Sequence, residues 1–173
     1  MSASLHELFL GFSIRKLDQL TSRIVDCLGR LSDEQVWARK HPTQNAVGNL
    51  VLHLCGNVRQ WIGYGVVGLP DIRHRQEEFD ATGPMPVEEL KLRLREAVQA
   101  AAASLEGLGP EDLLRRTTIQ GYELTVLEAI YHVVEHFSQH TGQVIYATKQ
   151  LTVGGLGYYR HLHDTPGQAP STP

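Results

Sequence analysis

The chain has 173 residues and a mass of 19.3 kDa, the size of one domain with one hydrophobic core. Sixteen Lys and Arg against nineteen Asp and Glu give a net charge of −3, so no basic excess is present to bind nucleic acid. The apolar runs are too short to cross a bilayer, and the first residues lack the pattern of a signal peptide. We therefore expect a cytoplasmic protein with neither nucleic acid nor a membrane as partner.

The first half of the chain predicts two long helices. Ser4 and Glu7 fit a capping box, and apolar residues at spacings of three and four continue to about residue 31. A short turn of helix is predicted at 32–37. The second long helix is predicted over 45–64. Cys27 and Cys55 lie in separate apolar helical patterns without a CxxC motif, so we expect both to be reduced and buried.

The second half predicts two more helices separated by an extended segment. Residues 65–85 have the composition of a long loop, of the kind that is often functional or lid-like. A third helix follows from Pro86 to about residue 108. Residues 113–125 have a β-like pattern with a turn at Gly121, and a capping box at Thr125 and Glu128 opens a fourth helix to about residue 150.

These elements predict an all-α fold, a four-helix bundle with a short extended hairpin before the last helix. We assign residues 1–150 to a single domain and residues 151–173 to a Gly- and Pro-rich tail.

The fourth helix carries a histidine at every fourth position, His132, His136 and His140. The outer two are separated by about 12 Å along a straight helix, so all three cannot bind one metal ion. Two histidines that are four residues apart can bind one ion together. The apolar face of the helix lies nearer to His136 and His140 than to His132, which we expect close to solvent.

A two-histidine pair needs a ligand from another element, and His53 on the second helix is the best donor. Asn49 and Asn57 lie one turn on either side of it, and they and Gln143 are candidates to orient the imidazoles. From the residues alone, a metal site and three ordinary boundary histidines remain equally open readings.

The segment His132–Gln143, together with Val47–His53, resembles the DinB-like (YfiT-like) superfamily of bacterial four-helix-bundle proteins. The resemblance covers about residues 5–150. It implies a metal held by His53, His136 and His140, an up-down-down-up bundle and often a homodimer. It also implies zinc, nickel or iron as the metal, and activities that use a low-molecular-weight thiol such as bacillithiol, glutathione or mycothiol.

Three histidines leave a divalent ion open positions for a water or a thiol, whose pKa the ion lowers. We therefore expect a metal-dependent enzyme that transfers a thiol to a small molecule or hydrolyses it. The alternative is a non-enzymatic metal-binding or ligand-binding bundle of the DinB-like stress type. A third reading is a helical dimer without metal.

Overall fold

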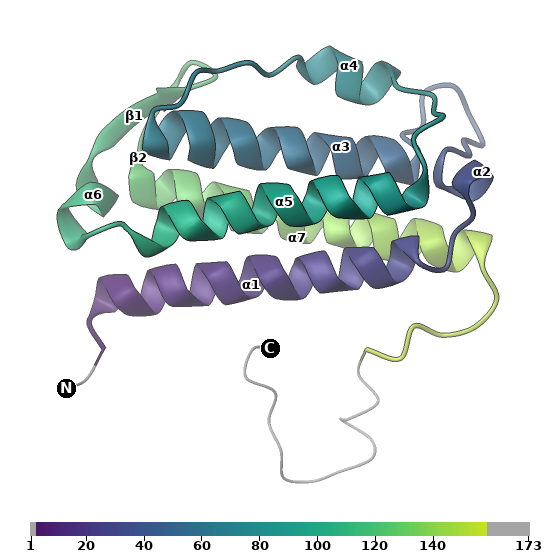
Figure 1. Ribbon diagram of the computed structural model, residues 1–173, viewed down its shortest axis with the longest axis horizontal. Coiled ribbons are helices and arrows are strands. Elements are labelled where there is room, and N and C mark those ends of the chain that lie inside the picture. Colours follow the sequence, from purple (N-terminus) through teal and green to yellow (C-terminus); the bar gives the residue numbers. More distant parts are fainter. Residues whose placement is uncertain (1–2, 159–173) are drawn as a thin grey trace, which may run out of the picture.

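The computed structural model contains four long helices that lie side by side (Figure 1). The structure describes residues 3–158. The predicted all-α four-helix bundle with a hairpin before the last helix is confirmed. The bundle is formed by α1 (Leu5–Leu28), α3 (Val47–Val58) with its π-helical continuation η1 (Arg59–Val67), α5 (Val87–Glu106) and α7 (Val126–Leu151).

The helices follow an up-down-down-up course, because α1 and α7 run in one direction and α3 and α5 in the other (Figure 1). α1 packs against α5 and α7, and α3 packs against the same two helices. Since α3 and α5 are parallel, the chain returns along the length of the bundle between them. This crossover, residues 68–86, lies over α3 and contains the short helix α4 (Arg75–Asp80).

The prediction of one long loop over 65–85 was therefore wrong in part. Its first three residues belong to η1, and α4 occupies its middle. The apolar pattern could not show α4, because none of the residues of this helix is buried.

The predicted capping boxes form at the N-termini of α1 and α7. At the start of α7, the Thr125 hydroxyl accepts from the Glu128 amide at 3.2 Å, and the Thr125 amide donates to Glu128 Oε2 at 2.6 Å. At the start of α1, the Ser4 amide donates to Glu7 Oε2 at 2.7 Å. A third box opens α2 (Asp33–Val36), where the short helical turn was expected.

The hairpin joins α6 (Pro110–Leu114) to α7 and lies against the end of η1. Its strands, β1 (Arg116–Ile119) and β2 (Tyr122–Thr125), are antiparallel. Gln120 and Gly121 both have positive φ, 54° and 83°, as a two-residue type I′ turn requires. Ile119 is fully buried, and a Cβ at Gly65 would overlap its side chain. Glycine at position 65 therefore allows the hairpin to lie directly on η1.

The segment after α7 packs on the bundle as far as the structure describes it. Leu156 is buried, and the Tyr158 hydroxyl donates to Asp26 Oδ2 at 2.9 Å. The rest of the predicted tail, 159–173, lies outside the described residues. Cys27 and Cys55 are buried free thiols, and burial raises the pKa of Cys55 to about 12. Over residues 3–158, no helix has the length and apolar character needed to cross a membrane.

Candidate metal site

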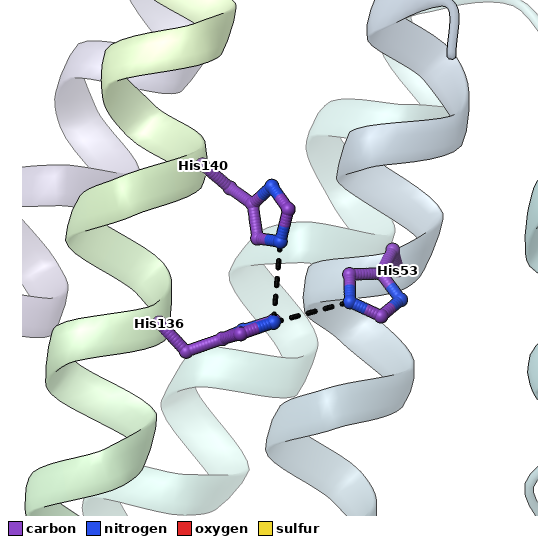
Figure 2. A group of neighbouring side chains, drawn as sticks. All are labelled: His53, His136 and His140. Atoms are coloured by element: carbon purple, nitrogen blue, oxygen red, sulfur yellow. Dashed lines mark hydrogen bonds between the residues drawn. The ribbon is translucent and has the colours of Figure 1, made fainter. Parts of the chain in front are cut away.

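His53 from α3 and His136 and His140 from α7 meet at one point between the two helices (Figure 2). His136 Nε2 lies 3.2 Å from Nε2 of His53 and 3.2 Å from Nε2 of His140. One ligand nitrogen from each ring lies within 4.8 Å of the other two. Nitrogens bound at 2.0–2.1 Å to a tetrahedral ion lie about 3.3 Å apart, so this group can hold a metal ion.

His136 and His140 of α7 are held in the neutral form. Burial, followed by the neighbouring His140 and His53, lowers the pKa of His136 to about 3. Burial also lowers the pKa of His140. Neutral imidazole is the form that binds a metal, so these rings do not have to lose a proton near neutral pH.

Glu78 of α4 contacts the His53 ring at the nitrogen that does not face the other histidines, with Oε2 2.9 Å from Nδ1. Arg73 donates two hydrogen bonds to the same carboxylate, from Nε to Oε1 at 2.7 Å and from Nη2 to Oε2 at 2.8 Å. Burial opposes the charge on Glu78, but hydrogen bonds from Arg73 and His53 outweigh it and lower the pKa of this carboxyl. A carboxylate can only accept, so its contact fits the tautomer of His53 that carries the proton on Nδ1 and directs the Nε2 lone pair at the other two histidines. Nη2 of Arg73 also lies 3.1 Å from this Nδ1.

Gln143 occupies a similar position on α7, since its Oε1 lies 2.7 Å from Nδ1 of His140. His136 has no such contact: its Nδ1 is buried and has no hydrogen-bond partner within residues 3–158. The rings of His53 and His140 are therefore each held at Nδ1 by a neighbouring side chain, while their Nε2 atoms face the shared point.

The candidate Asn49 lies near the site but orients the crossover instead of an imidazole. Its Nδ2 donates to the carbonyls of Glu78 at 2.9 Å and Ala81 at 2.8 Å. Asn57 is buried, and its Oδ1 has no hydrogen-bond partner in the described part of the chain. Glu78 and Arg73 were missed from the sequence. The one indication in the sequence was that both residues lie in the predicted long loop 65–85, and loops of that length are often functional.

His132 was expected close to solvent, but its ring is only partly exposed. It is half-buried, and its ring stacks on Trp61 of η1 with 3.8 Å between ring centroids. It also stacks on His136 at 5.5 Å. His132 therefore borders the three-histidine group without joining it.

Comparison with known proteins places the chain in a family. The model of the family "Protein of unknown function (DUF1572)" matches residues 4–157. The chain belongs to this family. No curated protein matches it.

Solved structures share the fold of this DUF1572 member at low sequence identity. A conserved protein from Enterococcus faecalis is 16% identical with a TM-score of 0.66, over 86% of this chain and 97% of that one. A DinB-like protein from Bacillus cereus is 18% identical with a TM-score of 0.66, over 83% and 95%. The fold that the resemblance to the DinB-like superfamily implies is confirmed.

A third structure with this fold is a mycothiol-dependent maleylpyruvate isomerase. It is 13% identical with a TM-score of 0.62, over 83% of this chain. The chain spans 63% of the length of that enzyme.

The contact between Glu78 and α3 requires glycine at position 56. A Cβ there would overlap Oε1 of Glu78 and lie 2.9 Å from Nε of Arg73. We expect Gly56→Ala to lower the free energy of unfolding by about 1–3 kcal/mol, since the carboxylate must move and release its partners. Urea denaturation measures the change.

Gly142→Ala is the matched control. It lies inside α7, and a Cβ there meets nothing within 4 Å. We expect this variant to raise the free energy of unfolding by about 0.5–1 kcal/mol, because alanine favours helix. Equal effects of the two substitutions would contradict the assigned role of Gly56.

Proposed function

We propose that this DUF1572 protein is a divalent-metal-dependent enzyme that delivers a thiol, or a water, to a small molecule. The observation that carries the proposal is the convergence of three Nε2 atoms at ligand spacing, 3.2 Å for both contacts of His136. Zinc, nickel and iron all accept imidazole nitrogen. The donor set therefore fits the metals that the family resemblance implies.

An incomplete ligand shell favours a catalytic role over a structural one. Within residues 3–158, no further His, Cys, Asp or Glu joins His53, His136 and His140 as a ligand group. Structural zinc sites are closed by four protein ligands, whereas catalytic sites keep a position for water or substrate. Three ligands therefore support a site that acts on a small molecule.

The surrounding residues favour thiol delivery over hydrolysis. A bound divalent ion would lower the pKa of a coordinated thiol or water and so supply a nucleophile near neutral pH. Glu78 is engaged by Arg73 and His53 and is not free to act as a general base. A thiol needs less help from a base than water does, because its pKa is already near 8–9. The shared fold with a mycothiol-dependent isomerase also supports a thiol cofactor.

Metal content tests the ligand assignment. We expect about one divalent ion per chain in the purified protein by elemental mass spectrometry, and loss of that ion in His136→Ala and His53→Ala. His132→Ala is the matched control, since this histidine lies one turn away on the same helix and is outside the group. Absence of metal from the wild type, even after reconstitution with zinc, nickel or iron, would overturn the proposal.

Glu78 should tune metal affinity without being a ligand. In Glu78→Gln the charged acceptor of the His53 Nδ1 proton is lost, and we expect zinc affinity to fall about 10–100-fold. Glu77→Gln changes the adjacent carboxylate, which is exposed and does not contact His53, and should leave affinity unchanged. Competitive titration against a chromogenic chelator measures both variants. If Glu78→Gln bound zinc as tightly as the wild type, the contact with Glu78 would not orient the ring of His53.

We also propose that the protein is a cytoplasmic homodimer, in line with its free thiols and with the family resemblance. Exposed apolar side chains at the start of α1, Leu5, Leu8 and Phe12, support a contact with a second copy. We expect light scattering to give about twice the chain mass, and Leu8→Glu to reduce it to the mass of a monomer. A monomeric wild type would refute the dimer.

A further inference from the structure

A cleft of about 740 Å³ lies between the start of α3 and the C-terminal half of α7 and adjoins the three-histidine group at Gln143. Gln143 belongs to both places, since it lines the cleft and contacts Nδ1 of His140. Leu50 and Gln139, which also line the cleft, lie three residues before His53 and directly before His140 in the chain. The volume is that of a pocket for a small organic molecule.

The charged side chains that line the cleft are both basic. Arg39 and Lys40 line it, and no Asp or Glu is among its lining residues within the described part of the chain. The whole protein has a net charge of −3, so the charge of this surface is opposite in sign to that of the whole chain. The other lining residues are amides and apolar side chains, among them Gln139, Val47, Leu50 and Leu151.

Arg39 is fixed in place but is not neutralised. Its Nη2 lies 2.7 Å from the carbonyl of Ala81, 3.2 Å from that of Phe79 and 2.9 Å from Oδ1 of Asn49. All three acceptors are uncharged, and no carboxylate pairs with Arg39 in the structure of residues 3–158. Nε and Nη1 have no hydrogen-bond partner there either, so the guanidinium keeps both its charge and donors for a ligand.

We propose that this cleft binds an organic carboxylate, with its anionic group at Arg39 and Lys40 and its carbon chain along Val47, Leu50 and Leu151. A half-buried, pre-positioned guanidinium recognises a carboxylate through charge-assisted hydrogen bonds. The apolar wall selects an organic anion over an inorganic one. The inference rests on the proposed function for its role, because it names the substrate class for a cleft that adjoins the histidine site, but the binding itself does not require a metal.

The test is an NMR titration of metal-free protein with hexanoate, hexanamide and acetate, following the backbone amides of Gln139, Gly142 and Gln143. Metal-free protein is used so that a carboxylate bound directly to an ion cannot imitate the cleft. We expect hexanoate to bind at least about tenfold more tightly than neutral hexanamide and than acetate, which lacks the chain.

Two variants and a control locate the anion. We expect Arg39→Gln to weaken hexanoate about tenfold or more, and exposed Lys40→Gln to weaken it about two- to threefold. Arg116→Gln, on the hairpin at the opposite end of the bundle, should leave hexanoate binding unchanged. In the structure of residues 3–158 the hydrogen bond of Lys40 runs from its backbone amide to Gln44, not to the crossover, so its variant keeps the test valid if Arg39→Gln disturbs folding.

The outcomes separate this inference from the proposed function. Equal binding of hexanoate and hexanamide, or no binding of either, would overturn the carboxylate cleft. A zinc titration of the same samples reports on the histidines independently. Anion binding without zinc binding would support the cleft and refute the metal-dependent enzyme, and zinc binding without anion binding would do the reverse.

Discussion

The parallel course of α3 and α5 is the constraint on which the candidate site depends. Two consecutive parallel helices force the chain to return along the bundle, and residues 68–86 make that return over α3. The crossover brings the Arg73–Glu78 ion pair, with both side chains nearly buried, against His53. Gly56 leaves room for this pair on the helix surface. Asn49 and Arg39 then fix the crossover through its backbone carbonyls. One segment therefore completes the bundle topology and orients His53.

The three histidines are supported unequally, in keeping with their places in the bundle. His53 is buried, with 4% of its surface exposed, and a charged partner offsets the cost of removing its ring from water. His140 is half-buried and contacts the neutral amide of Gln143. His136, between the other two rings, has no partner for Nδ1 in the described chain. The strongest side-chain contact is thus made to His53, the one histidine of the group that comes from α3.

The residues alone left open the meeting of His53 with His136 and His140, which the resemblance to the DinB-like superfamily implied. Local sequence signals predicted the helices, their capping boxes and the hairpin turn at Gly121. These follow from periodicities and turn chemistry within a few residues. Glu78 could not be found in this way, because it lies 25 residues from His53 with no periodic relation to it. The stacking of His132 was missed because a helical wheel ranks the faces of one helix only. Its stacking partner, Trp61, comes from η1.

The distance along the chain between the histidines links ion binding to the stability of the whole bundle. His53 and His136 are 83 residues apart in sequence and come together only when α3 packs on α7. The unfolded chain retains no such arrangement, so an ion held by all three rings would bind the native state alone. The free energy of unfolding would then rise by about 1.4 kcal/mol for each tenfold increase in free ion above the dissociation constant. The resistance of this bundle to heat would therefore follow the metal supply of the cell.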